Sequence, residues 1–350
     1  MTFHADPAVP SRPISGRKRF TASLFCFHTV VALLLFGCKS PHRSTGFRVA
    51  LVTPGSITDA AWNSGAYAGL IQVRDSLGAE ISQVEAHTPG EQEDNLRRFA
   101  AEGYPLIFGH GFEFQDPAER VSKDYPNTIF VITSGERQTG NVTPLIFRLH
   151  EATYLAGMVA GGMTRSGIIG FVGGIELPPI ELGYAGWANG ARAVNPAIQS
   201  RSVYLNSFDD VAAGREAALQ LISLGGDMLH HNADAAALGL FQAVKESPHA
   251  YVFGANSDQT SLAPERVLGS AVIDLPRAFL SVAREVKDGH FVPRVESFGL
   301  ASGVVLYQPN PALAGLVPDV LAAKVAAARD SIAAGILDPL QTTPILAKQP

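Results

Sequence analysis

The sequence contains little cysteine, and this scarcity excludes several kinds of site. Two of its 350 residues are cysteines, Cys26 and Cys38. Cys26 lies inside an apolar segment near the N-terminus, so a chain processed after that segment would keep a single cysteine at its new start. Neither a disulfide framework nor a cysteine-based metal site is therefore expected in the main body of the chain.

Motifs of common catalytic chemistries are also missing. The chain has no G-x-S-x-G nucleophile elbow, no G-x-x-x-x-G-K-[ST] phosphate loop and no H-E-x-x-H metal motif. A glycine-rich stretch at residues 167–174 lacks the G-x-G-x-x-G order of a dinucleotide site, and tight turns explain it better. His230, His231 and His249 have no carboxylate at metal-ligand spacing. We expect no cofactor and no metal.

Positive charge is scarce beyond the N-terminal segment. The sequence has 27 Lys and Arg against 32 Asp and Glu, a formal net charge of −5 at pH 7. Without residues 1–37, 23 basic and 31 acidic residues remain, and the net charge is −8. An acidic chain without a Lys/Arg cluster is poorly suited to nucleic acid, which we exclude as a partner. Later apolar runs are too short to span a membrane.

The N-terminal segment has the pattern of a bacterial export signal. A basic stretch at 17–19 precedes an apolar run from about 20 to 36, which a glycine separates from Cys38. This order is typical of a signal that ends at a lipidation site. We predict a lipoprotein signal peptide at 1–37, lipidation of Cys38, and a polar tether at 38–46. The alternative is an uncleaved membrane anchor, for which the apolar run is short and interrupted by polar residues.

Apolar β-rich runs and amphipathic helical stretches alternate along the remaining chain. The alternation begins with a strand at 47–53 and a helix from about 60 to 77, and it restarts after the extended passage at 141–150. This pattern predicts an α/β fold of two doubly wound lobes, each with a parallel sheet covered on both faces. The length beyond the signal also exceeds what one hydrophobic core usually organises.

Segments near the C-terminus exceed the needs of the second lobe alone. They include a long alanine-rich helix expected from about 311 to 335. We therefore expect the chain to cross between the lobes several times and so form a stiff hinge. The predicted division assigns 47–145 plus about 274–297 to lobe 1, and 146–273 plus about 298–340 to lobe 2.

Polar and aromatic residues follow most of the predicted strands. In an open parallel sheet, ligands bind beyond the carboxyl ends of the strands. This rule points to Asp59, Asn63, Phe112, Glu113, Thr133, Ser134, His230, His231, Asn256 and Asp258. The candidate ligand-binding residues that we select are Asp59, Trp62, Asn63, Tyr67, Phe112, Thr133, His230, Asn256 and Asp258.

The residues around the first loop allow two interpretations. Asn63 and Tyr67 are four residues apart and share a helix face, so with Asp59 they would present an acceptor, an amide and an aromatic ring to one planar solute. Alternatively, Asp59 caps the helix while Trp62 and Tyr67 pack in the core. Asp258 has a similar alternative as a cap of the following turn. Trp187 is interpreted as a packing residue.

Several segments resemble those of a known family. They are SITDAAWNSGAYAGL, FRLHEATYLAG, GFVGGIELPP with GWANGARAVNP, LGLFQAVKE, and ANSDQTSLAPERVLGSAV. In this order, from about Arg48 to Val305, they resemble the basic membrane lipoprotein family, also described as Med or PnrA-like. The resemblance implies an exported lipoprotein with the two-lobed type I periplasmic binding fold. It also implies delivery of a small solute, a purine nucleoside in the best understood members, to an ABC importer.

The resemblance assigns roles to residues of the first loop. Asp59, Trp62 and Asn63 match the family's acidic residue and aromatic–Asn pair, and Tyr67 falls near the position of a base-stacking aromatic. His230 takes the place of the second stacking aromatic.

At other positions the sequence departs from the family pattern. Asn256 stands where the family more often has an aspartate that holds ribose hydroxyls, and Ile273 stands where a lysine is expected. Thr133 or Ser134 replaces an acidic residue. Such exchanges of hydrogen-bonding groups are expected to change the ligand.

We interpret the chain as a non-enzymatic receptor of the cell envelope, a monomer anchored to a membrane through lipid. It would bind a nucleoside or similar heteroaromatic solute between the lobes and dock to an ABC permease. Two alternatives remain open: a ligand-sensing lipoprotein partnered with a signalling receptor, and a cleft enzyme acting on nucleosides.

Overall fold

Two six-stranded sheets organise residues 46–59 and 61–341, which the computed structural model describes. The first sheet has the order β2-β1-β3-β4-β5-β11, and all neighbouring strands are parallel. Its strands are β1 (Arg48–Thr53), β2 (Glu80–Glu85), β3 (Leu106–His110), β4 (Ile129–Thr133), β5 (Val142–Phe147) and β11 (Glu296–Phe298). The predicted signal peptide and Cys38 lie outside the described residues.

The second sheet has the order β7-β6-β8-β9-β10-β12. Its strands are β6 (Ile168–Gly173), β7 (Gln199–Tyr204), β8 (Met228–Asn232), β9 (Tyr251–Asn256), β10 (Val267–Ile273) and β12 (Val305–Pro309). All pairs are parallel except β12 with β10. β12 enters the sheet at the carboxyl end of β10, where Val305 lies opposite Ile273, and it therefore runs in the reverse direction.

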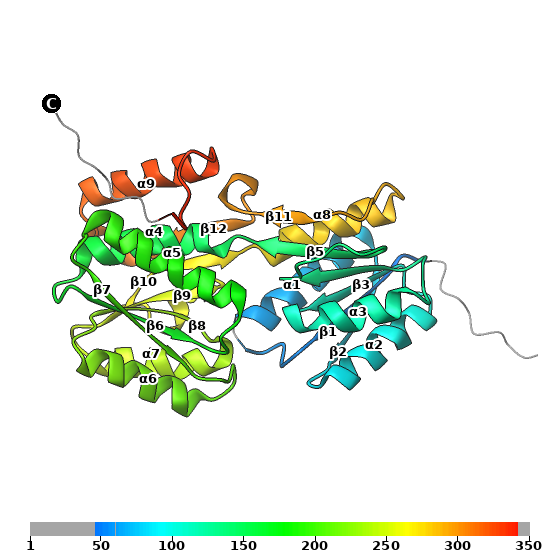
Figure 1. The fold of residues 1–350 in the computed structure, drawn as a ribbon, viewed down its shortest axis with the longest axis horizontal. Helices are drawn as coiled ribbons and strands as arrows, with labels where there is room; N and C mark the ends of the chain where they lie inside the picture. The colour runs from blue at the N-terminus through cyan, green and yellow to red at the C-terminus, as the bar shows by residue number, and fades with distance from the viewer. Residues whose placement is uncertain (1–45, 60, 342–350) are drawn as a thin grey trace, which may run out of the picture. The chain divides into compact units, whose positions relative to one another are not determined.

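Helices cover both faces of each sheet (Figure 1). Helices α1 (Trp62–Leu77) and α8 (Leu275–Lys287) cover one face of the first sheet. Helices α2 (Pro89–Ala101) and α3 (Gln115–Ser122) cover the other. In the second sheet, one face is covered by α4 (Leu149–Met163), α5 (Pro178–Val194) and α9 (Asp319–Ala333). The other face is covered by α6 (Val211–Ser223) and α7 (Ala237–Glu246). The prediction of an α/β fold with two doubly wound lobes is confirmed. No helix among the described residues has the length and apolar character needed to span a membrane.

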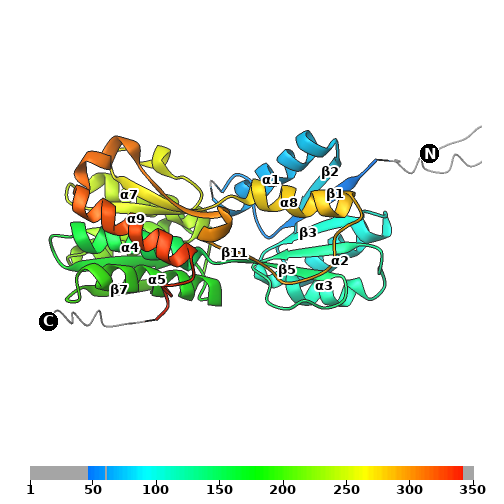
Figure 2. The same ribbon diagram turned by 90° about the horizontal axis from the view of Figure 1, so that it is seen from above.

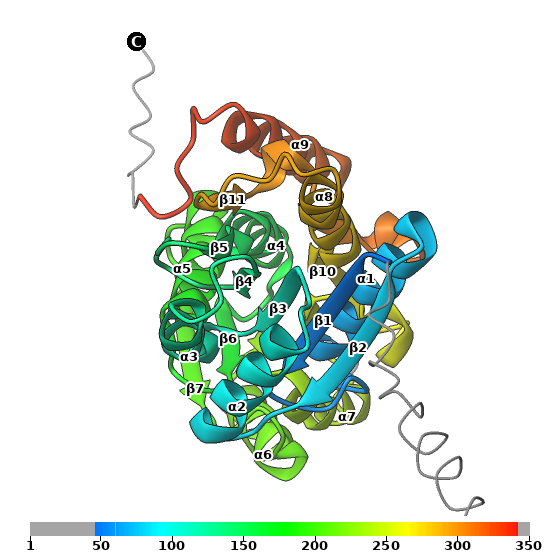
Figure 3. The same ribbon diagram turned by 90° about the vertical axis from the view of Figure 1, so that its right-hand side faces the viewer.

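The chain passes between the sheets after β5, after β10 and again between β11 and β12. Helix α8 consequently lies beside α1, although more than 190 residues separate them in sequence (Figures 2 and 3). Glu151 joins two of these passages, because its Oε2 accepts a hydrogen bond from Leu300 N at 2.6 Å and its Oε1 lies 2.7 Å from Arg148 Nε. The expected repeated crossing of the chain between the two lobes is confirmed.

One expected helix is divided in two. A short 3₁₀ helix (Pro311–Leu316) precedes α9, which begins at Asp319. Pro318 separates them, and Val317 before it has an extended conformation with φ −83° and ψ 119°. A proline disfavours the helical conformation of the preceding residue. The expectation of one continuous helix from about 311 to 335 is wrong for this reason.

Helices α4 and α5 pack with their backbones in close contact. A methyl group added at Gly157 would overlap the backbone oxygen of Trp187, and one added at Gly190 would overlap that of Tyr154. Because packed interiors absorb little extra volume, any side chain at these positions forces the helices apart.

Replacing Gly157→Ala is expected to lower the free energy of unfolding by about 3 kcal/mol, since the helices must separate to admit the methyl group. Gly183→Ala in α5 is the matched control, because nothing lies within 4 Å of its added methyl group. Alanine favours a helix over glycine by up to about 1 kcal/mol, so this variant should be neutral or more stable. Urea denaturation measures the free energy of unfolding of both variants, and equal losses would contradict the close packing of α4 against α5.

Candidate functional site

A pocket lies where the carboxyl ends of strands from both sheets meet. Its lining residues come from segments at the ends of β1, β3, β4 and β5 in the first sheet and of β6 to β10 in the second. Its volume of about 140 Å³ suits a small molecule. This edge is where open parallel sheets bind their ligands.

Asp59 fixes the loop that leads into α1. Its Oδ1 accepts hydrogen bonds from Ala61 N at 3.0 Å and Ser64 N at 2.9 Å, and its Oδ2 accepts one from Asn63 N at 2.7 Å. These amides belong to the start of the helix, where the helix dipole favours a negative charge. Asp59 therefore stabilises the start of α1, as the capping alternative holds, and it also lines the pocket.

Trp62 rests on a buried histidine. Its ring stacks on His110 with centroids 4.0 Å apart and an angle of 26°. His110 Nε2 lies 3.0 Å from Trp62 O and Nδ1 lies 2.9 Å from Thr133 Oγ1. Burial lowers the pKa of His110 to about 3, so the ring is neutral. Because Trp62 O can only accept, Nε2 carries the proton and Nδ1 accepts from the Thr133 hydroxyl.

Two further polar residues of the first sheet line the pocket. Asn63 is 6 % exposed, and its Oδ1 has no hydrogen-bond partner among the described residues. Glu113 is accessible within the pocket, but the surrounding walls desolvate it and raise its pKa. Its carboxylate folds against Gly111, where any added side chain would overlap it. Both Asn63 and Glu113 thus offer oxygen acceptors to an occupant.

The second sheet contributes a buried polar cluster. Asn256 Nδ2 donates hydrogen bonds to Asn232 Oδ1 at 3.1 Å and to Asp234 Oδ1 at 3.2 Å. Burial, followed by the nearby charge of Asp59, raises the pKa of Asp234 to about 8, although the hydrogen bond from Asn256 acts in the opposite direction. Asp234 is therefore largely protonated at neutral pH.

The pocket also concentrates unusual backbone conformations. Four described non-glycine residues have positive φ, and three of them line the pocket: Ser134 at +56°, Asp234 at +44° and Asn256 at +64°. Such conformations carry a cost and cluster at functional sites.

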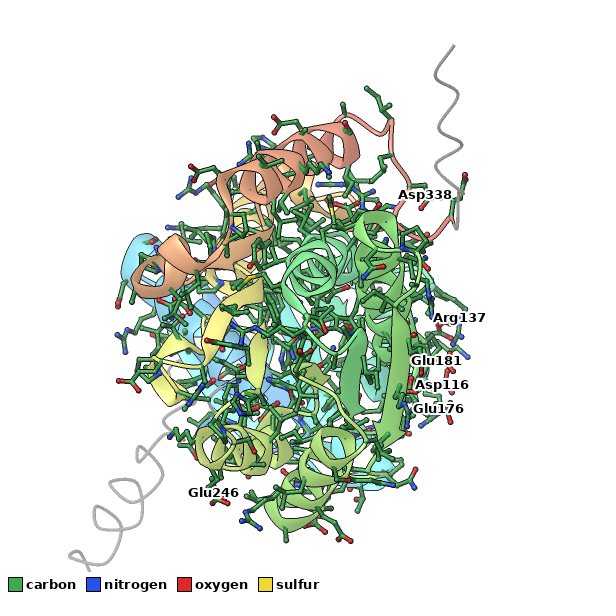
Figure 4. All side chains as sticks on the ribbon, turned by 90° about the vertical axis from the view of Figure 1, so that its left-hand side faces the viewer. Asp116, Arg137, Glu176, Glu181, Glu246 and Asp338 are labelled. Atoms are coloured by element: carbon green, nitrogen blue, oxygen red, sulfur yellow. The ribbon has the colours of Figure 1, made fainter. Side chains whose placement is uncertain are left out.

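The pocket is lined by both carboxyl groups and aromatic rings. Among the described residues that line it, the carboxylates are Asp59, Glu113, Asp209 and Asp234, and no lysine, arginine or histidine is present. The aromatic rings are Trp62, Phe112, Phe147 and Phe208. At the surface, by contrast, acidic side chains often have cationic partners: Arg137 pairs with Asp116 at 2.7 Å and Arg215 pairs with Glu246 at 2.6 Å. The labelled Asp116, Arg137 and Glu246 point outward in Figure 4.

Five of the predicted site residues line the pocket: Asp59, Trp62, Asn63, Phe112 and Asn256. Tyr67 and Thr133 do not. Tyr67 is half-buried and packs against the core of the first sheet, as the core alternative holds. Thr133 is fully buried behind His110, so its effect on the pocket passes through His110 and Trp62.

His230 and Asp258 also lie outside the pocket lining. His230 is fully buried, with Nδ1 3.1 Å from Phe253 O and its ring 5.1 Å from that of Trp187, so it packs in the core. Asp258 is exposed, and its Oδ1 accepts from Thr260 N at 3.0 Å and Thr260 Oγ1 at 2.6 Å, which matches the capping alternative.

The second-sheet residues Asn232 and Asp234 were not selected from the sequence, although Asn232 ends β8 and Asp234 lies two residues after it. Their position at the carboxyl end of a parallel strand is the sequence signal that points to them. Other unselected lining residues carry no sequence signal of their own, namely Phe147, Leu149, Leu177, Pro179, Ile180, Phe208 and Asp209.

The raised pKa of Asp234 predicts a pH-dependent stability. Between its ordinary value of 3.8 and about 8, the folded state holds a proton that the unfolded state releases, so the free energy of unfolding falls as pH rises through this window. The slope is at most about 1.4 kcal/mol per pH unit. Asp234→Asn should remove it, so that the variant is the more stable protein at pH 8 to 9, while the two are similar near pH 4. Urea denaturation across this range tests the prediction, which a pH-independent difference would contradict.

Comparison with known proteins places these observations in a family. Basic membrane protein A2 of Borrelia garinii subsp. bavariensis is 31% identical over 296 residues, covering 82% of this chain and 87% of the relative. The ABC transporter nucleoside-binding protein BmpA of Lactococcus lactis subsp. cremoris is 28% identical over 287 residues, covering 74% and 82%.

A solved ABC transporter solute-binding protein from Aeropyrum pernix K1 has the same fold, with a TM-score of 0.77 at 21% identity over 83% of this chain and 92% of that protein. The family described as "ABC transporter substrate-binding protein PnrA-like" matches residues 47–326. The chain therefore belongs to the Bmp family of PnrA-like ABC transporter substrate-binding proteins.

Proposed function

We propose that this protein is the lipid-anchored substrate-binding subunit of an ABC importer, and that it binds a purine nucleoside or a similar heteroaromatic solute without altering it. The observation that carries the proposal is the pocket, which sets Trp62 and Phe112 beside the polar cluster of Asn232, Asp234 and Asn256. Aromatic rings suit a planar base, and the amide and carboxyl groups suit its hydroxyl and amino groups. A relative named as a nucleoside-binding protein supports this choice of ligand.

The arrangement of the pocket supports a binding protein that closes on its solute. Lining residues come from both sheets, so an occupant contacts both and favours the arrangement in which these contacts are complete. The three chain passages between the sheets are the hinge for such a closure. A permease would then recognise the closed form.

The N-terminal sequence supports membrane attachment. Acylation of Cys38 would add several hydrocarbon chains, each worth about 0.8 kcal/mol per buried CH₂, and more than one chain gives a stable anchor. The binding domain would work in the cell envelope, beside the permease and outside the cytoplasm.

Ligand binding is expected to change the fluorescence of Trp62 but not that of Trp187. These are the only two tryptophans in the sequence, and Trp187 is fully buried in the core of the second sheet, outside the pocket lining. In the Trp187→Phe variant, Trp62 is the remaining tryptophan. Adenosine or inosine should therefore shift the tryptophan emission of this variant, because Trp62 lines the pocket. Trp62→Phe, which keeps Trp187, is the matched control and should show little change. A signal confined to Trp62→Phe would contradict the proposed site.

Thermal denaturation of the wild type with the same nucleosides gives an independent readout. A ligand at 100 times its Kd stabilises the fold by about 2.7 kcal/mol, which shifts the Tm by several degrees.

Lipidation is expected to depend on Cys38 alone. Cys38→Ala should abolish incorporation of a palmitate analogue in bacterial cells and release the protein from the membrane fraction, because the thiol is the acylation site. Cys26→Ala is the matched control, since Cys26 lies within the predicted signal and should not be needed. Label that persists in Cys38→Ala would rule out this anchor.

A further inference from the structure

The acidic residues that line the pocket indicate the charge of the ligand, in addition to its planar shape. Four carboxyl groups line it, and none of the described lining residues is a cation. The four come from separate segments: Asp59 precedes α1, Glu113 follows β3, Asp209 precedes α6 and Asp234 follows β8. Electrostatic repulsion reaches from the first sheet to the second, because Asp59 and Glu113 both raise the pKa of Asp234.

One of the four carboxylates is already compensated. Asp59 accepts three hydrogen bonds from amides at the start of α1, so the fold accounts for its charge. No ion pair involving Glu113, Asp209 or Asp234 is found among the described residues. Glu113 and Asp209 keep contact with solvent, whereas Asp234 is buried and largely protonated at neutral pH. A cation placed beside Asp234 would favour its ionised form.

A second, independent feature points to a hydrogen-bond donor. Asn63 is 6 % exposed, lines the pocket, and leaves its Oδ1 without a partner. A buried acceptor without a partner costs free energy that a ligand N–H group would recover. The pocket thus offers hydrogen-bond acceptors, carboxyl groups and aromatic faces to the same occupant.

We propose that the ligand is a positively charged heteroaromatic solute, whose charge lies among Glu113, Asp209 and Asp234 while its ring lies against Trp62 and Phe112. The inference rests on the proposed function, because it names the ligand class of the same pocket. Both kinds of group favour such a cation, since aromatic faces attract positive charge as carboxylates do.

Isomeric methylated nucleosides test the role of charge at constant size. 1-Methyladenosine carries a positive charge at pH 7, whereas N6-methyladenosine, its isomer, is neutral. Isothermal titration calorimetry with the wild-type protein should give at least tenfold tighter binding of 1-methyladenosine than of N6-methyladenosine or adenosine. 1-Methylnicotinamide and neutral nicotinamide form a second pair, which lacks ribose and should show the same preference.

Asp234→Asn separates charge from shape. Asp234 has φ +44°, a conformation that asparagine also adopts readily, so the backbone should be retained. The variant should reduce the preference for 1-methyladenosine to less than threefold. Asp210→Asn is the matched control, because Asp210 is exposed, does not line the pocket and caps α6 through Ala213 N, which asparagine can also do. This variant should keep the full preference.

The outcomes distinguish this inference from the proposed function. Neutral nucleosides that bind as tightly as their charged isomers would overturn the cationic ligand and leave the nucleoside receptor standing. A preference that Asp234→Asn leaves unchanged would also overturn it. Binding of 1-methylnicotinamide but of no nucleoside would support the cation and overturn nucleoside specificity. If none of these compounds binds, both proposals fail.

Discussion

The common direction of the strands is the constraint on which the rest of the structure depends. Nine of the ten neighbouring pairs of strands are parallel. The parallel strands of a sheet therefore all end at the same edge and deliver their loops there. Asp59, Glu113 and Asp234 come from three such loops and Asn256 ends β9, yet they line one pocket. Strained conformations at Asp234 and Asn256 are tolerated because buried strands hold the residues before them.

Behind the pocket, buried groups without solvent contact hold its surface residues in place. His110 is neutral, and its hydrogen bonds with Trp62 O and Thr133 Oγ1 fix its tautomer. Its ring stacks on the indole of Trp62. Thr133 therefore affects the site through its hydrogen bond to His110 and does not line the pocket itself. The same division holds in the second sheet, where His230 packs in the core while Asn232, two residues later on β8, lines the pocket.

Much of this architecture could be predicted from periodicity, but the exceptions have local causes. Parallel strands and covering helices follow from apolar runs alternating with amphipathic segments, and Asp59, Trp62 and Asn63 follow from the rule on strand ends. The antiparallel β12 could not be predicted, because its direction depends on where the chain enters the second sheet. The break before α9 was readable from Pro318. Phe208 and Asp209 line the pocket because of the path of the loop between β7 and α6, and this path cannot be predicted from the periodicity of the sequence.

Because the pocket is lined by residues of both sheets, the affinity for a ligand and the tendency of the two sheets to close on it are coupled. A solute that contacts a single sheet cannot favour a closed arrangement, because it gains nothing when the other sheet approaches. Here Asp59 and Glu113 belong to the first sheet and Asp234 to the second, and the charges of Asp59 and Glu113 raise the pKa of Asp234. Under the proposed function, a cationic occupant that contacts both sheets would offset this repulsion. The carboxylates that select the solute would then also report its presence to the permease.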